Sequence, residues 1–572
     1  MPSYTPPLQD MAFLLNSVTP LAALGREDLD AEMVSAVLEE AAKLASGVLA
    51  PLNESGDRQG STWQEGAVTT AKGFKEGYKA FCEGGWNAVP FDPDYGGQGL
   101  PWLMSFPLQE MWQSSSLSFG LCPLLTQGAV EAISTHGSDE LKEKYLAKLI
   151  SGEWTGTMNL TESHAGSDLS LIRTKAERAG DGTYRLTGQK IFITHGEHDM
   201  AANIIHLVLA RLPDAPEGVK GISLFIVPKI LEDGTRNDVT CVSIEHKLGI
   251  NASPTCTMQF GEKGGAIGYL VGKENDGLKY MFTMMNNARL SVGLQGVAVA
   301  ERAFQTALAY ASDRLQGKPL SGGETIAIIG HPDIRRMLLT MKVLIDAGRA
   351  LSYEAAFYLD KAKAGDAAAQ ARVDLLTPIV KSGCTDMAVE VASLGIQVHG
   401  GMGFIEETGA AQFYRDARIL PIYEGTNGIQ AADLLFRKTI KDQGRATGDW
   451  IEEAQKTAAQ SGDDALKAAL SHLSAATAYL LQESKSLDKI AAVAVPYLSL
   501  FFVVAGGVML TRMSLAAQQT GQKDLAETRA ALKAFYNAHI LSKVEGLETT
   551  VRQGSEFVGP ASSSLQPVFS QR

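Results

Sequence analysis

The chain has 572 residues, of which 45% are hydrophobic and 20% are charged, and its formal net charge is −13. A chain of this length is too long for one hydrophobic core, and its composition is typical of a globular protein with three or four domains. The negative charge argues against a nucleic-acid partner and against an anionic membrane surface.

The five cysteines are scattered and include no C-x-x-C pair. This spacing indicates neither a disulfide framework nor a metal site, and it fits a reducing compartment. The first residues show no basic region followed by an apolar one, so we expect no secretory signal. These features predict a cytoplasmic protein.

Residues 1–155 are predicted to form an N-terminal helical domain. Apolar side chains recur at helical spacing from Asp30 to Leu49. A Gly/Pro-rich stretch, residues 89–101, predicts a loop, and Ser138 is placed to cap a later helix.

Residues 156–272 change to the spacing of strands and predict an inserted β domain. Short segments with β-branched or alternating apolar residues are separated by Gly, Pro and Asp turns. Strands are expected at residues 184–194, 203–211, 221–228 and 255–260.

Helical spacing returns over residues 273–444, which we predict to be a helical bundle. An Ala-rich helical extension follows over residues 445–572, with a Ser/Pro/Gln tail after about Val551 that is expected to be loosely ordered. The fold class is therefore mainly α with an inserted β domain. Because strands and helices do not alternate, a Rossmann arrangement is excluded.

One apolar run, Ile490–Thr511, contains no charged residue and is long enough to span a bilayer. Pro496, the Gly506-Gly507 pair and many alanines interrupt it, and the neighbouring helices are polar. We therefore predict a buried helix or helix pair and no membrane span.

Two loops of the β domain could bind a flat ligand. Residues 158–169, M-N-L-T-E-S-H-A-G-S-D-L, offer hydroxyls and free amides, although a capped turn would look the same. In G-Q-K-I-F-I-T-H-G, residues 188–196, strand alternation puts Phe192 and Thr194 on one face, although an aromatic here is more often core. His195 and His198 lack a third ligand nearby, so we expect them to be structural or surface residues.

Residues 398–404, V-H-G-G-M-G-F, look like a dinucleotide-binding glycine loop, but they follow no strand and lack the G-x-G-x-x-G spacing. We interpret them as a glycine turn that ends a helix near a phosphate chain. Arg314 ends another helix, and its alternative interpretation is a solvated cap.

Residues 415–430, R-D-A-R-I-L-P-I-Y-E-G-T-N-G-I-Q, place Glu424 between an apolar run and a glycine turn. Apolar neighbours disfavour a charged carboxylate, so we expect the pKa of Glu424 to rise toward that of a useful base. The glycines let backbone approach a ligand, and Thr426 adds a hydroxyl. On spacing alone, a structural turn with an incidental acid is favoured. The expected apolar neighbours are Ile419, Leu420, Ile422 and Tyr423.

Five motifs occur together and in order: T-E-S-H-A-G-S-D, G-Q-K-I-F-I-T, V-H-G-G-M-G-F, R-D-A-R-I and Y-E-G-T. Through them, residues 30–440 resemble the acyl-CoA dehydrogenases. The resemblance implies a helical domain, a β-barrel domain and a helical bundle, with FAD as the cofactor.

By this resemblance, two groups of residues would hold FAD. Those that would flank the flavin ring are Met158, Leu160, Thr161, Phe192 and Thr194, with Phe192 standing where many members have Trp. Those that match the contacts to the pyrophosphate and adenosine of a neighbouring subunit's FAD are Arg314, Gln316, Gln397, Gly400 and Gly401. Ser167 would lie near flavin phosphate or CoA, and Thr426 near the adenosine phosphate. A homodimer or a dimer of dimers is implied.

Glu424 matches the base that removes the α-proton while the β-hydrogen leaves as hydride, which gives a trans-2-enoyl-CoA. Its backbone N–H would help to polarise the thioester carbonyl. Some branches carry the base on an earlier helix, but that position is here Ala288. The expected substrate contacts are Ser167, Asn286, Arg289, Glu424 and Gly425.

The segment Y-E-G-T-N-G-I-Q-A, the opening M-P-S-Y-T-P-P and the helical extension resemble the subgroup that contains 3-methylmercaptopropionyl-CoA dehydrogenases. The expected substrate is 3-methylmercaptopropionyl-CoA or another short- or medium-chain acyl-CoA, in dimethylsulfoniopropionate degradation or fatty acid β-oxidation. Electrons would pass to an electron-transfer flavoprotein. Alternatives are a long-chain acyl-CoA dehydrogenase, an acyl-CoA oxidase that reduces O₂, and a non-enzymatic CoA-binding scaffold.

Overall fold

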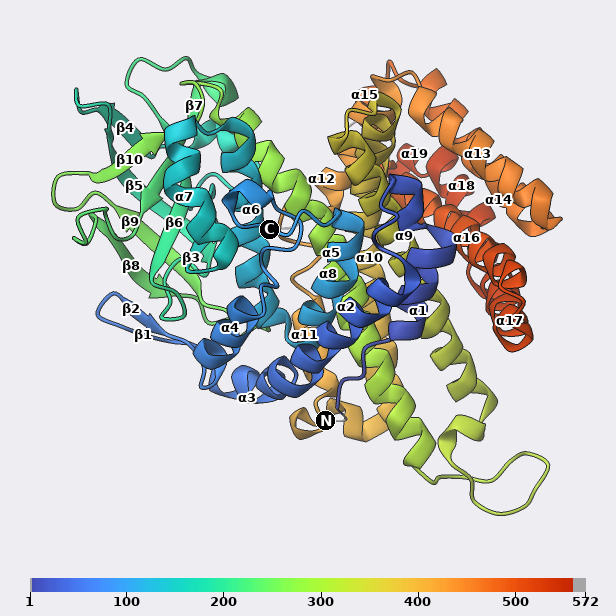
Figure 1. The fold of residues 1–572 in the computed structure, drawn as a ribbon. Helices are drawn as coiled ribbons and strands as arrows, with labels where there is room; N and C mark the ends of the chain where they lie inside the picture. The colour runs from blue at the N-terminus through green and yellow to red at the C-terminus, as the bar shows by residue number, and fades with distance from the viewer. Residues whose placement is uncertain (1–2, 559–572) are drawn as a thin grey trace, which may run out of the picture. The chain divides into compact units, whose positions relative to one another are not determined.

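The computed structural model describes residues 3–558, which fall into two compact units. Among these residues, unit 1 contains Pro7–Glu39 and the chain from Val292 onward, and unit 2 contains Ser3–Pro6 and Glu40–Ser291. Figure 1 shows the strands of unit 2 gathered beside several of its helices. The predicted fold class, mainly α with an inserted β domain, is confirmed.

Unit 2 begins with helices. Its helical elements are α3 (Pro51–Gln59), α4 (Phe74–Glu83), α5 (Trp102–Ser115), α6 (Leu117–His136) and α7 (Asp139–Ser151). The predicted cap is confirmed, because Ser138 Oγ accepts a hydrogen bond from Leu141 N–H at 3.3 Å. A small hairpin, β1 (Thr62–Gln64) and β2 (Ala67–Thr69), was not expected in this helical region.

The strands that follow in unit 2 form a β-barrel. Its strands are β3 (Trp154–Asn159), β4 (Lys175–Arg178), β5 (Tyr184–Thr194), β6 (Asn203–Arg211), β7 (Ile222–Pro228), β8 (Val239–Ile244), β9 (Thr255–Phe260) and β10 (Ala266–Leu270). They pair in the order β10-β7-β6-β4-β5-β9-β8, β3 pairs with β6, and a β10–β5 pairing closes the barrel. The four predicted strands are present, whereas β3, β4, β8 and β10 are short segments that the sequence did not single out.

Helix α6 packs directly on strand β3, and Gly156 makes this contact possible. A Cβ atom at Gly156 would lie 2.4 Å from the Cβ of Ala129, which no real pair of carbon atoms tolerates. This contact fixes the position of β3, and Met158 to Thr161 follow shortly after it, at the end of β3 and in the next loop.

Unit 1 is built on long helices. After α1 (Leu8–Phe13) and the start of α2 (Ala31–Leu44), it takes the second half of α8 (Gly277–Asp313) and the pair α9 (Pro332–Lys363) and α10 (Ala367–His399). Helices α8 and α10 approach closely, because a Cβ at Gly296 would lie 2.3 Å from the Cys384 carbonyl oxygen. Helix α10 is thus packed tightly against α8.

The remaining helices of unit 1 follow α10. They are α11 (Ala410–Ala417), α12 (Asn427–Ala432), α13 (Arg445–Ser461), α14 (Asp464–Gln482), α15 (Leu487–Ala491), α16 (Ala494–Gln519), α17 (Lys523–His539), α18 (Val544–Gln553) and α19 (Ser555–Val558). Helix therefore continues beyond Val551, and residues 559–572 of the predicted loose tail lie outside the described residues.

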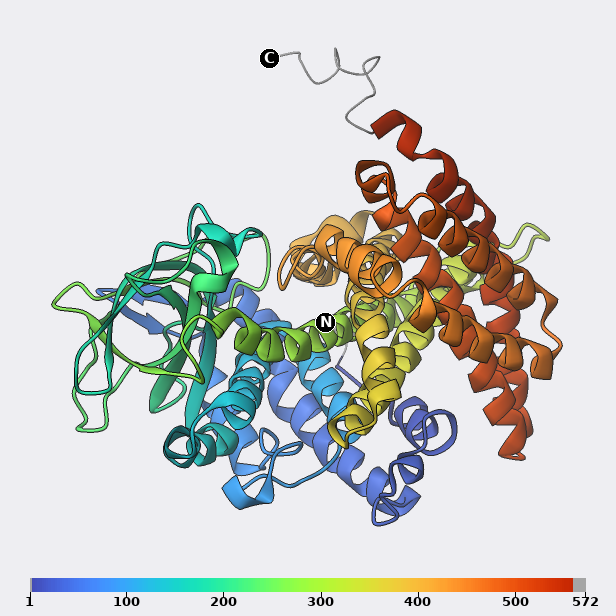
Figure 2. The same cartoon turned by 90° about the horizontal axis from the view of Figure 1, so that it is seen from above.

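Helix α16 is the apolar run that was long enough to span a bilayer. In the part of the chain that the structure describes, it alone meets that criterion of length and composition, and 78% of its apolar window is buried. It packs on α9, α10 and α17 within unit 1 (Figure 2). Gly506 faces Tyr536 so closely that a Cβ would lie 2.3 Å from the hydroxyl oxygen. The prediction of a buried helix is confirmed.

Candidate active site

Glu424 lies in the loop between α11 and α12, where its backbone is strained. Its φ is +56°, in the left-handed region that side chains other than glycine seldom adopt. The next residue, Gly425, continues the turn with a φ of +84°. Such strain costs about 1–3 kcal/mol and is concentrated at functional sites. Glu424 is therefore one of seven residues other than glycine, among those that the structure describes, that have a positive φ.

The apolar surroundings expected for Glu424 are only partly present in unit 1. Leu420 is fully buried, but Ile422 is 49% exposed and Glu424 itself is half-buried. Burial, followed by the negative charge of Glu424, raises the pKa of Tyr423 well above its usual range. The Tyr423 hydroxyl therefore stays protonated, and it donates a hydrogen bond to Gln295 Oε1.

Thr426 begins helix α12 as its N-cap. Its Oγ1 accepts a hydrogen bond from Ile429 N–H at 3.3 Å, which leaves the hydroxyl hydrogen for another acceptor. Gln430 Nε2 donates to the carbonyl oxygens of Glu424 and Gly425 at 3.4 and 3.5 Å. Glu424, Gly425 and Thr426 are thus brought together in one short turn.

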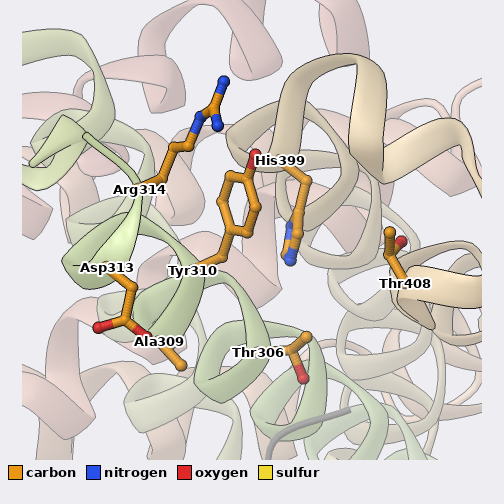
Figure 3. A pocket seen from close by; sticks show the side chains of 7 residues that line it. All are labelled: Thr306, Ala309, Tyr310, Asp313, Arg314, His399 and Thr408. Carbon is orange, nitrogen blue, oxygen red and sulfur yellow. The ribbon is translucent and has the colours of Figure 1, made fainter. Parts of the chain in front are cut away.

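A hollow of about 350 Å³ lies beside the end of α8 in unit 1, and Arg314 lines it (Figure 3). The rings of Tyr310 and His399 stack in it, with centroids 4.4 Å apart and planes 27° from parallel. His399 Nδ1 lies 2.7 Å from the Gly395 carbonyl oxygen, so Nδ1 carries the hydrogen and Nε2 is left as an acceptor. Burial lowers the pKa of His399 and keeps the ring neutral.

Arg314 is exposed in this hollow, and within residues 3–558 its guanidinium forms no ion pair. Gln316 and Gln397 are also exposed, on the strand-like turn after α8 and on the last turn of α10. Helix α10 ends at His399, and Gly400 follows with a φ of +59°, as expected of a helix-ending glycine turn. A Cβ at Gly400 or Gly401 would meet open space, so this backbone is accessible.

Sequence reasoning missed six lining residues of the hollow, among them the carboxylate of Asp313: Thr306, Ala309, Tyr310, Asp313, His399 and Thr408. Two of them carried a usable signal. His399 directly precedes the Gly400-Gly401 pair, and Tyr310 lies one helical turn before Arg314.

In unit 2, an exposed aromatic side chain stands on a bulge of strand β5. The pairing of β5 with β9 shifts between Lys190 and Ile193, and Phe192 has a φ of +60°. Phe192 is 59% exposed and Thr194 half-buried, whereas Ile193 between them is buried. The two predicted ligand-facing residues are therefore both accessible, through a bulge and not through plain strand alternation.

The loop after β3 lies beside this bulge. Ile191 N–H donates to the Thr161 carbonyl oxygen at 2.9 Å, which joins the loop to β5. Met158 and Thr161 are half-buried, and Leu160 is buried. Ser167 is exposed farther along the same loop. The structure therefore brings the predicted flavin-facing residues of unit 2 together, with Ser167 at the margin.

A fully buried lysine forms hydrogen bonds with this loop. Lys190 Nζ donates to the Leu160 carbonyl oxygen at 3.0 Å and to Glu162 Oε1 at 2.8 Å. Burial opposes ionisation of Glu162, but Lys190 and the hydrogen bonds from Thr174 and Arg173 hold its pKa below the ordinary value. Burial lowers the pKa of Lys190 to about 8, which leaves it protonated at neutral pH.

Near the start of α8, Arg289 and Asn286 lie one turn apart on the same face. Arg289 is buried and donates from Nη1 to Asn286 Oδ1 at 3.4 Å, while Asn286 is exposed. Ala288 is buried and carries no acid, as the sequence required.

Two histidines of unit 2 that could have suggested a metal pair lie in its interior. His195 and His198 are buried, and His198 Nε2 lies 2.9 Å from Thr155 Oγ1. Burial lowers the pKa of His195 to about 4. Both side chains are buried, as expected of the structural alternative and not of the surface one. Among residues 3–558, no group of three or more His, Cys, Asp or Glu side chains is placed to hold a metal ion.

Comparison with known proteins places the chain in a family. Models of the acyl-CoA dehydrogenase N-terminal, middle and C-terminal domains match residues 31–153, 157–262 and 275–437, and the model "Acetyl-CoA dehydrogenase C-terminal like" matches residues 438–558. A 3-methylmercaptopropionyl-CoA dehydrogenase of Ruegeria pomeroyi is 47% identical over 568 residues, which cover 94% of this chain and 96% of the relative. The chain belongs to the acyl-CoA dehydrogenase family.

Two solved structures that are similar to this chain extend the comparison. An acyl-CoA dehydrogenase complexed with FAD from Bacillus anthracis has a TM-score of 0.75 and 21% identity, and the match covers 98% of this chain and 94% of that chain. A structure described as the electron transferring flavoprotein of Acidaminococcus fermentans has a TM-score of 0.60 and 28% identity, covering 70% of this chain and 96% of that chain. The predicted family, fold and oxidoreductase class are confirmed.

The cofactor of this acyl-CoA dehydrogenase is FAD, and the residues present suit it. A flavin ring needs a flat apolar surface with polar groups at its edge, which Phe192 offers beside Thr161 and Thr194. A pyrophosphate needs a cation without a carboxylate partner, which Arg314 supplies.

Proposed function

We propose that this acyl-CoA dehydrogenase converts 3-methylmercaptopropionyl-CoA to its trans-2-enoyl-CoA and passes the electrons to an electron-transfer flavoprotein. The observation that supports this substrate is the 47% identity to the Ruegeria pomeroyi enzyme across nearly the whole of both chains. Because that match includes the helical extension, it is more than a likeness of the catalytic domains. Another short- or medium-chain acyl-CoA is the broader form of the same proposal.

Glu424 is proposed to be the base that takes the α-proton. Its side chain is half-buried and lies on a strained turn. Its backbone N–H would polarise the thioester carbonyl. Ala288 offers no second carboxylate.

Bound FAD supplies the acceptor for the β-hydrogen, which leaves the substrate as hydride. Phe192 would cover the ring, with Met158, Leu160, Thr161 and Thr194 around it. This assignment is supported by the exposure of Phe192 and by the hydrogen bond that joins the Thr161 loop to β5.

The pyrophosphate and adenosine of FAD are proposed to come from a neighbouring copy of the chain. The residues that would hold them are Arg314, Gln316, Gln397, Gly400, Gly401 and Thr426. The unpaired guanidinium, the accessible glycine backbone and the free Thr426 hydroxyl hydrogen support this role. The active form is then a homodimer or a dimer of dimers.

Asn286, Arg289, Ser167 and Gly425 are proposed to contact the CoA thioester. Arg289 would place a positive charge near the substrate, and its hydrogen bond to Asn286 holds the exposed amide ready for a polar group of CoA. The glycine at position 425 leaves room beside the Glu424 carboxylate.

Anaerobic titration of the purified holoenzyme with a panel of acyl-CoA thioesters tests the proposal. We expect 3-methylmercaptopropionyl-CoA to bleach the flavin absorbance at the lowest concentration and butyryl-CoA to follow. Bleaching by long-chain thioesters alone would contradict the substrate. Rapid hydrogen peroxide formation in air, with no gain from added electron-transfer flavoprotein, would contradict the acceptor and favour an oxidase.

A further inference from the structure

The strain at Glu424 needs a cause. A left-handed backbone at a residue other than glycine persists only when surrounding contacts hold it there. The hydrogen bonds that Gln430 makes to the turn are long, at 3.4 and 3.5 Å, and they contribute little to such restraint.

The stronger contacts come from one side chain on helix α10. Lys381 is fully buried, and its Nζ donates to the Leu420 carbonyl oxygen and to Asn427 Oδ1, each at 2.9 Å. Leu420 precedes Glu424 by four residues and Asn427 follows it by three. One ammonium group therefore fastens both ends of the loop to the same helix.

Asn427 completes this anchor. Its Nδ2 donates to Asp386 Oδ1 at 2.8 Å and to Thr385 Oγ1 at 3.0 Å, both on α10. The N–H of Asn427 also donates to the Pro421 carbonyl oxygen at 3.0 Å, which closes the loop on itself. The segment 420–427 can therefore shift only if the contacts with Lys381 and Asn427 break.

We propose that Lys381 is a positioning residue for α-proton removal, because its buried ammonium fixes the loop that carries Glu424. This inference rests on the proposed role of Glu424 as the base. Lys381 acts through the ends of the loop, where it donates to a main-chain carbonyl oxygen and to an amide oxygen. A methionine at this position has a similar length and makes neither bond, so it would free the loop to move.

A displacement of about 1 Å in a reacting group costs about 100-fold in rate. We therefore expect Lys381→Met to lower the rate of α-proton removal by about 100-fold. Asn427→Ala keeps the bond between Lys381 and Leu420, so we expect a smaller loss, about tenfold, from the same distortion.

The test measures proton removal apart from hydride transfer. In (methylthio)acetyl-CoA the β position is sulfur and carries no hydrogen, so the enzyme can only exchange its α-protons with solvent deuterium. Exchange is followed by mass spectrometry for the wild type, Lys381→Met, Asn427→Ala and Glu424→Gln. Amide hydrogen exchange of residues 420–427 and the FAD content are measured on the same samples.

Lys342→Met is the matched control. Lys342 is a mostly buried lysine of α9 in the same unit, and it bonds Asp10 and Asp346, which Arg529 also contacts. It should lose a comparable amount of stability and keep the wild-type rate of α-proton exchange, because it does not touch the Glu424 loop.

The proposal predicts slow α-proton exchange and faster amide exchange at residues 420–427 in Lys381→Met, with FAD and acyl-CoA still bound. Exchange at the wild-type rate in Lys381→Met, while Glu424→Gln is inactive, overturns the role of Lys381 alone. Exchange at the wild-type rate in Glu424→Gln overturns the proposed base and the role of Lys381 together. An equal loss in Lys342→Met would assign the effect to general destabilisation and overturn the inference. If Lys381→Met does not fold, α-proton exchange at the wild-type rate in Asn427→Ala would overturn the role of Lys381 instead.

Discussion

The bulge of β5 in unit 2 and the Glu424 loop in unit 1 are both strained, but different chemical groups hold them in place. Each holds a functional side chain on a left-handed backbone, with φ of +60° at Phe192 and +56° at Glu424. Near each lies a lysine with no exposed surface, whose Nζ bonds one main-chain carbonyl and one side-chain oxygen. The hydrogen bonds of a single buried lysine can thus hold a strained loop in place.

The two anchors differ in the charge of the partner. Lys190 bonds the carboxylate of Glu162, which also accepts hydrogen bonds from Thr174 and Arg173. Lys381 donates to the neutral amide of Asn427, and its charge opposes the rise in the pKa of Asp386 that burial causes. Loss of the first lysine leaves a directly bonded carboxylate without its cation, whereas loss of the second removes bonds to an amide oxygen and a carbonyl oxygen and a charge near Asp386. The first should therefore matter more for folding, and the second for the position of the loop.

Lys190→Met should give the largest loss of stability. We expect about 3–5 kcal/mol, because removing one member of a buried ion pair leaves the other uncompensated. Lys381→Met should lose less, about 1–3 kcal/mol, which is the cost of unsatisfied neutral acceptors. Denaturant unfolding of the two holoenzymes measures both values. Lys148→Met, at an exposed site in unit 2, should change stability by less than about 1 kcal/mol. Equal losses at Lys190 and Lys381 would remove the distinction between the two anchors.

Acid should weaken the barrel of unit 2. Burial lowers the pKa of His195 to about 4 and that of His206 to about 3, from 6.5 in the unfolded chain. Between these values the unfolded state binds more protons, so the free energy of unfolding falls as the pH drops from about 6.5 to about 4. His195 alone accounts for up to about 3 kcal/mol. Unfolding at pH 7 and pH 4.5 measures the loss, which His206→Gln should reduce and the exposed His246→Gln should leave unchanged. A stability independent of pH over this range would contradict the buried neutral rings.

Phe192→Leu should have the smallest effect. The change keeps apolar bulk and removes the aromatic face, which is worth about 0.5–1.5 kcal/mol in a ring contact. We expect FAD affinity to fall by up to about tenfold, since 1.4 kcal/mol is a factor of ten. Titration of the apoenzyme with FAD measures it, and Leu171→Ala, an exposed apolar site in the same unit, is the control. An unchanged affinity in Phe192→Leu would exclude the stacking role.

Local patterns in the sequence were sufficient for features that depend on neighbouring residues. Ser138 as a cap, the strand 184–194 and the buried α16 all follow from spacing and composition. Strands such as β4 were missed because they are short and have one buried residue, so only their partners define them. The stack of Tyr310 on His399 joins residues far apart in the chain, which no local pattern indicates.

The two lysine anchors could not be predicted from the sequence for a related reason. A lysine in a polar or mixed stretch is normally solvated, and its burial depends on acceptors supplied by a distant loop. Lys381 and Asn427 are 46 residues apart, and they meet only because α10 and α12 pack together. The motif around Glu424 indicated the base, whereas its support became visible only in three dimensions.

The central claim is that Glu424 removes the α-proton, and a comparison of the wild type with Glu424→Gln tests it most directly. Both holoenzymes, with equal FAD content, are mixed anaerobically with saturating 3-methylmercaptopropionyl-CoA while the flavin absorbance is recorded. We expect rapid bleaching in the wild type and, in Glu424→Gln, bound thioester with bleaching slower by at least about 100-fold, the lower bound expected for loss of a general base. Bleaching of Glu424→Gln at the wild-type rate would contradict it.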